Sequence, residues 1–178
     1  PSQDMVLGIY YLTQERPGVK GEGMIFRNVN EAILAYENQE ATLHSRVKVR
    51  VSKTMPDGTV KTGIIESTIG RFIFNEIIPQ DLGFVDRSIP GNELKLEVDF
   101  HVAKKQLKQI LEKVINVHGA TQTAVTLDDI KAIGYKYSTK AAMPVSISDM
   151  TVPASKPRLI KEAQATVDRI AKNYRRGL

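Results

Sequence analysis

The stretch LHSRVKVRV, residues 43–51, alternates apolar and basic side chains and decides the predicted fold. Because successive side chains of a β-strand point to opposite faces, its three valines share one face and its basic residues share the other. Pro56-Asp57-Gly58 has strong turn chemistry, and residues 59–67 are expected to return as a second strand. The sequence therefore predicts a β-hairpin at the centre of the fold.

The basic residues of the first strand, Arg46, Lys48 and Arg50, are compatible with two roles. They line one face and could contact phosphate groups. Alternate basic side chains are also usual on the solvated face of a half-exposed strand, and this second interpretation is favoured.

Two helices are predicted before the hairpin. The first begins at a capping residue, Ser2 or Asp4, and ends before Arg16-Pro17-Gly18. The second begins at a cap supplied by Asn30 and ends near residue 38. Helices and a hairpin thus follow one another in the N-terminal part.

After an irregular stretch at residues 80–98, the pattern becomes helical. Residues 104–118 place apolar side chains on one face, and Gly119 is a helix-stop signal. Thr126, with an aspartate three positions later, is close to a capping box, so a short helix is expected from there to about Gly134.

Irregular chain is expected over residues 135–150, and a last helix follows Pro153. Apolar residues in this helix are spaced 3, 4, 3 and 4 apart, which is typical of a coiled-coil seam that needs one partner helix. An ordinary core-facing helix would show the same spacing over two heptads. The seam residues are Ile160, Ala163, Val167, Ile170 and Tyr174.

The predicted fold class is α+β, with mixed helices around a small antiparallel β-hairpin and a mainly helical C-terminal part. That part is expected to end in one arm of an antiparallel coiled coil. Three regions follow: an α+β region over residues 1–98, a helical region over 99–152, and a truncated coiled-coil arm over 153–178. Because the chain opens at Pro1 and stops as a helix ends, we expect a piece cut from a longer protein.

Basic residues are concentrated in the second part of the 178-residue chain, whose net charge is +5. Residues 1–98 hold 11 Lys and Arg against 13 Asp and Glu, whereas residues 99–178 hold 14 against 7. This distribution suits a polyanionic partner, although a solvated, Lys-rich helical surface explains it equally well.

The sequence lacks the patterns of a free-standing enzyme. It has no cysteine, no phosphate loop and no nucleophile elbow. His44, His101 and His118 are scattered, and each is expected to be a surface or half-buried residue rather than a metal ligand. No catalytic residue and no metal site is therefore predicted, and a cytoplasmic protein without a membrane span is expected.

Several ordered stretches resemble the β′ (largest) subunit of bacterial DNA-directed RNA polymerase, and their collinearity argues against chance agreement. One departure is Lys140-Ala141-Ala142, which stands where that family usually has Arg-Ser-Gly. From the N-terminus the stretches are PSQDMVLGIYYLT at 1–13, KGEG at 20–23, AY at 35–36, LHSRVKVR at 43–50, TIGR at 68–71, FNEIIP at 74–79, GYKYST at 134–139, SISDM at 146–150 and YRRGL at 174–178.

The resemblance implies an architectural role in transcription. The matching part of the family is the pore region and the start of the funnel, up to the first rim helix. It lines the secondary channel through which nucleotides reach the active site. The family binds two catalytic Mg²⁺ ions with the aspartates of an Asn-Ala-Asp-Phe-Asp-Gly-Asp loop, which this sequence does not contain. Mg²⁺ is thus expected to bind outside this chain, which alone should be inactive.

The resemblance also implies partners and contact residues. The partners are the remainder of β′, the other polymerase subunits, DNA template, RNA, nucleoside triphosphates, and transcript-cleavage-type factors at the rim, in the bacterial cytoplasm. Gln3 is expected to contact nucleotide or the RNA 3′ end, with an N-cap or a buried structural amide as alternatives. On the rim helix, channel ligands or factors would meet Lys156, Arg158, Lys161, Glu162, Asp168 and Arg169, unless these form only a solvated flank.

Two other functions are compatible with the sequence. An independent basic nucleic-acid-binding module would use the C-terminal charge, but aromatic residues make up only 6% of the chain and offer little stacking surface. A coiled-coil adaptor would dimerise through residues 159–174.

Overall fold

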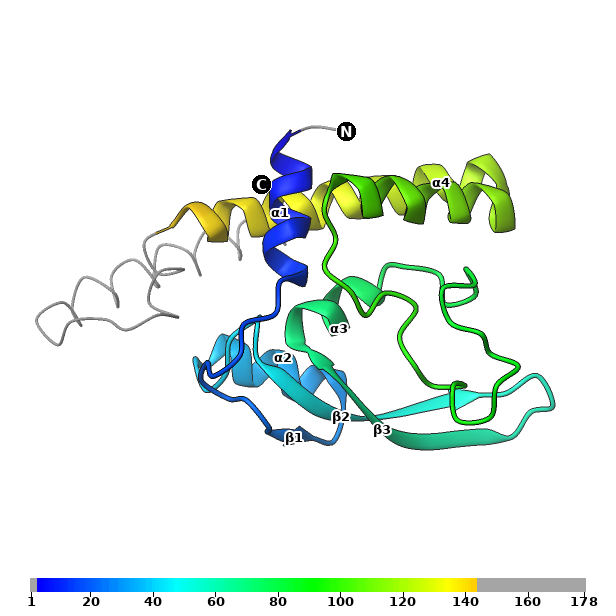
Figure 1. The fold of residues 1–178 in the computed structure, drawn as a ribbon, viewed down its shortest axis with the longest axis horizontal. Coiled ribbons are helices and arrows are strands. Elements are labelled where there is room, and N and C mark those ends of the chain that lie inside the picture. Colours follow the sequence, from blue (N-terminus) through cyan, green and yellow to red (C-terminus); the bar gives the residue numbers. More distant parts are fainter. Residues whose placement is uncertain (1–2, 144–178) are drawn as a thin grey trace, which may run out of the picture.

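The structure, a computed structural model, describes residues 3–143. The predicted α+β class is confirmed for these residues (Figure 1). The predicted last helix, with its coiled-coil seam, lies outside the described residues. The elements, in chain order, are α1 (Gln3–Thr13), β1 (Ile25–Phe26), α2 (Val29–Glu37), β2 (Arg46–Thr54), β3 (Val60–Thr68), α3 (Ile69–Asn75) and α4 (Lys104–Ala142).

The predicted hairpin is confirmed. β2 and β3 pair antiparallel from Arg46 opposite Thr68 to Thr54 opposite Val60, while β1 adds in parallel to the other edge of β2. As expected, Val47 and Val49 are buried while Lys48 and Arg50 are exposed; Val51 is half-buried. The strand starts three residues later than predicted, because residues 43–45 are entirely buried and pack beneath α1 and α3 instead of joining the ladder.

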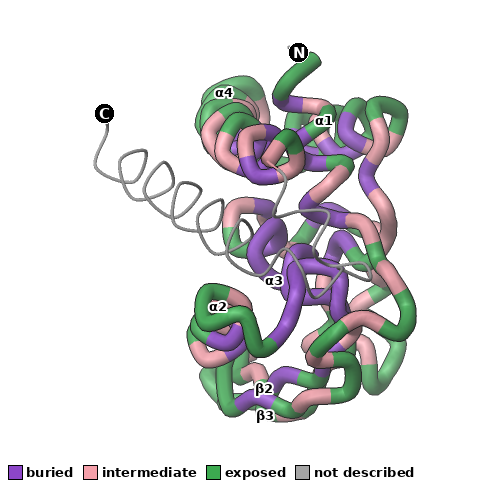
Figure 2. The backbone as a smooth tube through the Cα atoms, turned by 90° about the vertical axis from the view of Figure 1, so that its left-hand side faces the viewer, coloured by how far each residue is buried: buried purple, intermediate pink, exposed green. Residues whose placement is uncertain are grey.

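These elements are arranged in three layers. Figure 1 shows the sheet at the bottom, α2 and α3 above it, and α1 with α4 at the top. All seven residues of α3 are buried, and one continuous hydrophobic core runs from α1 and α4 to β2. In Figure 2 the buried segments are densest around α3, between the sheet and α4. This short helix is therefore the centre of the core.

The capping residue of α2 differs from the prediction. Asn28, not Asn30, has the extended backbone of a cap, and its side chain accepts a hydrogen bond from the Glu31 backbone N–H at 2.8 Å. Asn30 lies inside the first helical turn. Asparagine is a suitable cap at either position, and the helix begins directly after Asn28, the residue that closely follows β1.

The predicted end at Gly119 is confirmed, since this residue has a non-helical backbone (φ 82°, ψ −177°) within the α4 range. The predicted new start at Thr126 is wrong, because helical structure surrounds this residue and its side chain is fully buried. The irregular chain predicted after Gly134 is also wrong up to Ala142, which is still helical. Packing of α4 against α1 overrides the weak local preferences of these residues.

Gly134 marks a helix crossing rather than a helix end. A Cβ atom at Gly8 of α1 would overlap the Gly134 carbonyl, and a Cβ at Gly134 would meet the Met5 backbone. The two backbones therefore approach each other more closely than any residue with a side chain would allow.

The irregular chain over residues 80–98 is confirmed, since it holds no helix or strand. Its shape depends on a buried carboxylate: Glu97 accepts from the Arg87 guanidinium at 2.8 Å and from the Phe84 backbone N–H at 3.0 Å. Arg87 also donates to the Lys95 carbonyl at 2.6 Å. Within residues 3–143, no helix is long and apolar enough to cross a membrane.

Candidate functional site

The solvent-facing stripe of α1 is the candidate site. Gln3, Leu7 and Tyr10 follow one another at spacings of four and three, so they share one side of the helix. Leu7 and Tyr10 are 49% and 43% exposed, while the opposite side of α1 is buried in the core. We call these three residues the outer stripe. It combines an amide, an aliphatic side chain and a phenol on one accessible surface.

Gln3 lies in the first turn of α1 and is exposed. A buried structural amide, one of the sequence-based alternatives, does not fit this position. Its amide group offers both donors and an acceptor to a ligand. Contact with nucleotide or RNA remains a prediction.

Three basic side chains from three other segments hold the C-terminal end of α1. His101 Nε2 lies 2.9 Å from the Tyr10 carbonyl oxygen and His44 Nε2 lies 2.8 Å from that of Tyr11. Each imidazole must donate here, because a carbonyl oxygen only accepts. The last carbonyls of a helix lack donors within the helix, and these contacts supply donors to them; the Tyr11 carbonyl also accepts from the Gln14 backbone N–H at 3.3 Å.

The third basic side chain, Arg71, is buried and donates from Nε to the Thr13 carbonyl at 3.0 Å. Its Nη1 also lies 3.4 Å from Glu15 and 3.5 Å from Asp99. The guanidinium thereby joins α1, α3 and the segment before α4. Because the fork is planar and its partners are fixed, it sets the position of α1 on the rest of the fold.

Arg46 extends this ion-pair network to the sheet. Its guanidinium contacts Glu15 at 3.0 Å and Glu66 at 3.2 Å. Burial lowers the pKa of Arg46, but the charges of Glu15, Asp99 and Glu66 outweigh burial and hold that pKa above its ordinary value. β2 carries four basic residues, Arg46, Lys48, Arg50 and Lys53. Arg46 is structural, and its neighbours on the same face, Lys48 and Arg50, are exposed.

The network explains the TIGR motif at residues 68–71. The Thr68 hydroxyl caps α3 by accepting from the Arg71 backbone N–H at 3.2 Å. Gly70 donates its N–H to the Leu43 carbonyl at 2.9 Å, and a Cβ there would overlap the Leu12 carbonyl. From the sequence, this motif was identified only through its resemblance to the family. Its structural role depends on contacts with residues 12, 13 and 43, which are distant in the sequence.

All three histidines make structural contacts, and the sequence-based prediction was wrong for His44. This residue is fully buried rather than half-buried or exposed, because its imidazole caps α1. His101 stacks on Tyr10 with ring centroids 4.1 Å apart, and His118 pairs with Asp81 at 2.6 Å. Among residues 3–143, no three His, Asp or Glu side chains gather in a group that could hold a metal ion.

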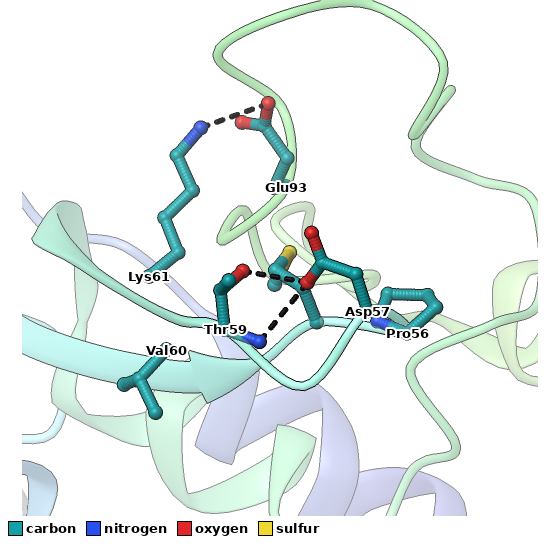
Figure 3. A pocket seen from close by; sticks show the side chains of 7 residues that line it. Pro56, Asp57, Thr59, Val60, Lys61 and Glu93 are labelled. Carbon is teal, nitrogen blue, oxygen red and sulfur yellow. Dashed lines mark hydrogen bonds and ion pairs between the residues drawn. The ribbon is translucent and has the colours of Figure 1, made fainter.

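Two open grooves lie beside the hairpin. One, of about 570 Å³, surrounds its tip (Figure 3). There Asp57 accepts from the Thr59 N–H at 3.0 Å and from its hydroxyl at 2.6 Å, and Lys61 pairs with Glu93 at 3.0 Å. The polar groups at the tip thus satisfy one another. The second groove, of about 680 Å³, lies between β3 and residues 84–100.

The predicted rim contacts Lys156, Arg158, Lys161, Glu162, Asp168 and Arg169, and the seam from Ile160 to Tyr174, lie outside the described residues. Sequence reasoning missed Arg71, Asp99 and His101 as residues that position α1. No local pattern marks them, since each acts on a residue at least 28 positions away.

Comparison with known proteins gives one consistent result. The family described as RNA polymerase Rpb1, domain 3, matches residues 1–150. The DNA-directed RNA polymerase subunit beta′ of Lachnoclostridium phytofermentans is 66% identical over 178 residues, which are 100% of this chain and 14% of that protein. The subunit of Acetivibrio thermocellus is 56% identical over 178 residues (100% and 15%), and that of Clostridium acetobutylicum is 57% identical over 177 residues (99% and 15%). The chain thus spans 14–15% of the length of these relatives.

Proposed function

The chain belongs to the RNA polymerase Rpb1 domain 3 family, and from that membership we propose that it works as part of a DNA-directed RNA polymerase. The observation that carries the proposal is 66% identity to a beta′ subunit along the whole chain. Transcription, with DNA template, RNA and nucleoside triphosphates as ligands and other polymerase subunits as partners, is then the activity of the complete enzyme.

The role proposed for this segment is to line the secondary channel, so that nucleotides pass its surface on their way to the active site. The outer stripe supports this role, because it is an accessible surface on a helix whose other side is fixed by core packing and by the contacts of Arg71. A channel wall needs such fixed, exposed groups rather than a catalytic cluster.

Mg²⁺ enters the proposal only as a component of the complete enzyme. Residues 3–143 do not fit the ion, because no group of three potential ligands gathers there. The resemblance to the family implies that its ligands lie outside this chain, and we assign no chemical step to the chain itself. In this proposal the segment binds and orients nucleotide, and chemistry occurs elsewhere.

Gln3 is the residue proposed to contact nucleotide or the RNA 3′ end. Its replacement tests the proposal when made in the full-length subunit and assayed in the assembled polymerase. In Gln3→Ala, loss of one neutral hydrogen bond should raise the KM for nucleoside triphosphate by roughly fivefold, given about 1 kcal/mol per such bond. The kcat should change less, because the contact is made during delivery.

Gln109→Ala is the matched control, since Gln109 is an exposed glutamine on α4, on a different part of the surface. It should leave both constants unchanged. An unchanged KM in Gln3→Ala would contradict the role of this residue. Nucleotidyl transfer by the isolated chain above a no-protein control would contradict the architectural role altogether.

Factor docking at the rim belongs to the same proposal. The charged residues between 156 and 169 would present a surface to transcript-cleavage-type factors, on a helix that pairs through the seam residues. Reversing Lys156 and Lys161 together to Glu should weaken binding of such a factor to the assembled enzyme. Unaltered binding would remove this part of the proposal.

A further inference from the structure

The aromatic ring of the outer stripe is both exposed and held in place. Tyr10 is 43% exposed, and its ring lies against the imidazole of His101, which comes from the segment before α4. The two ring centroids are 4.1 Å apart and the ring planes are tilted by 42°. The same imidazole donates from Nε2 to the Tyr10 carbonyl at 2.9 Å. This hydrogen bond ties the imidazole to the backbone of α1, so the phenol ring rests against a fixed partner.

The segment that carries His101 is anchored on both sides of this residue. The Val102 backbone N–H donates to the Thr13 hydroxyl at 2.9 Å, and the Val102 side chain is fully buried. Two residues before His101, the Asp99 carboxylate accepts from the Ser67 hydroxyl at 2.6 Å. The imidazole therefore cannot leave α1 without breaking contacts of the core. The two rings form a preorganised aromatic surface that solvent reaches.

The chemistry of the outer stripe suits a flat, uncharged ring with a polar edge. Gln3 offers donors and an acceptor, Leu7 an aliphatic contact and Tyr10 the face of a ring, and none of them is charged. Exposed Asp4 follows Gln3, and its carboxylate would repel a phosphate group. A nucleobase is a flat ring of this kind, and bases stack on aromatic side chains whatever their sequence.

Positive charge lies at the start of α4, which Figure 1 shows beside α1. Lys104 and Lys105 follow His101 by three and four residues, are exposed, and form no ion pair with any residue between 3 and 143. Because the first turn of a helix already carries partial positive charge, two lysines there weaken the helix. The stability of α4 therefore does not explain them, whereas the phosphates of a nucleotide would.

We propose that the Tyr10 ring, held by His101, stacks against the base of a nucleotide that passes the outer stripe. The phosphates of the nucleotide then point toward Lys104 and Lys105, away from Asp4. His101 is a positioning residue, since it acts through Tyr10. The inference rests on the channel role proposed above and deepens it, because it assigns the base of the nucleotide to α1.

The test uses the assembled polymerase that contains the full-length subunit, with 5-iodouridine triphosphate as the probe. Under near-ultraviolet light, its base forms a covalent bond to an aromatic side chain that it contacts. We expect an adduct at Tyr10, located by mass spectrometry. An excess of UTP should suppress this adduct, whereas ribose 5-phosphate, which has no base, should not.

Variants separate the ring from its surroundings. Tyr10→Phe keeps the ring and should keep the adduct, while Tyr10→Leu should abolish it. His101→Ala should lower the adduct yield about threefold, because the ring loses its fixed partner. His118→Ala is the matched control, since this histidine pairs with Asp81 instead, and it should leave the yield unchanged.

Steady-state kinetics give a second readout. Tyr10→Leu should raise the KM roughly tenfold for ATP and roughly threefold for UTP, because a purine stacks over a larger area. The kcat should change by less than about twofold, and Tyr10→Phe should behave as wild type. A residue that only supported the fold would not separate the two bases.

An adduct at Tyr10 together with these KM changes supports the inference. Two results would overturn it: no adduct at Tyr10, as expected if the rest of the longer protein covers the outer stripe, or equal adduct yields in Tyr10→Phe and Tyr10→Leu. If Gln3→Ala still raises the KM in either case, only the base contact fails. If Gln3→Ala leaves the KM unchanged as well, the proposed channel role fails with it.

Discussion

At the residue scale, two glycines determine how α1 meets α4. Gly8 and Gly134 face each other where the helices cross, and neither position has room for a Cβ atom. Glycine in a helix normally weakens it by about 0.5–1 kcal/mol relative to alanine. Here the close backbone approach reverses that preference, because a methyl group would push the helices apart.

We therefore expect Gly8→Ala to destabilise the chain by about 3 kcal/mol. Urea unfolding followed by circular dichroism measures the free energy of unfolding. Gly63→Ala is the control, because a Cβ there meets only the flexible Leu94 side chain at 3.0 Å. It should change stability by less than about 1 kcal/mol. Equal effects of the two substitutions would contradict the crossing geometry.

Arg71 is the second residue on which the arrangement depends. Arg71→Met removes the buried donor to the Thr13 carbonyl and the cation that faces Asp99, while Glu15 keeps its contact with Arg46, so a loss of about 2 kcal/mol is expected. Arg27→Met serves as control, because Arg27 pairs with Glu31 at the surface and contributes less than about 0.5 kcal/mol. A loss below 1 kcal/mol for Arg71→Met in the same urea experiment would show that the network is not required.

At the scale of elements, the hairpin tip is a small self-contained unit. The Thr59 hydroxyl and N–H donate to the Asp57 carboxylate, and they lower the pKa of this carboxyl below its ordinary value, with the hydroxyl as the larger cause. Because the pKa of Asp57 is lower in the folded chain than in the unfolded chain, the contact stabilises the turn at pH values above the pKa of the unfolded chain. That stabilisation is lost as the pH falls through the folded pKa.

Thr59→Val should accordingly raise the pKa of Asp57 toward its ordinary value, because it removes the larger of the two causes. An NMR titration of the Asp57 side-chain carboxyl resonance measures this shift. Thr62→Val, which removes the contact with the Ser52 hydroxyl instead, should leave the Asp57 pKa as it is. Identical titration curves in wild type and Thr59→Val would mean that the turn contact is absent in solution.

At the scale of the whole molecule, the core joins regions that the sequence divides. α1 lies in the predicted region 1–98, yet its buried side packs against α4 in the region 99–152. The three-region division itself remains a prediction. Because the core is continuous, the two N-terminal regions are expected to unfold together rather than separately.

A chain of residues 1–143 should show one cooperative thermal transition, coincident by far-ultraviolet circular dichroism and tyrosine fluorescence. A chain of residues 1–98 should lose that transition, because the buried side of α1 would face water without α4. Retention of the transition at the same midpoint in the shorter chain would show that region 1–98 folds independently.

Local sequence alone determined the hairpin and its turn, the first helix, the break at Gly119 and the family resemblance. Each depends on neighbours in sequence: the period of two in residues 46–51, the turn chemistry of residues 56–58, or the order of motifs. It also pointed to Gln3, which the structure describes as an exposed residue of α1.

Tertiary structure alone decided the rest. The true length of α4, the burial of His44, the role of Gly134 and the ion pairs of Arg71 all follow from groups that meet across long sequence separations. Packing and charge pairing between such groups outweigh local propensities of less than about 1 kcal/mol per residue. Local patterns therefore predict the elements, whereas the contacts that fix α1, and with it the candidate site, exist only in the folded chain.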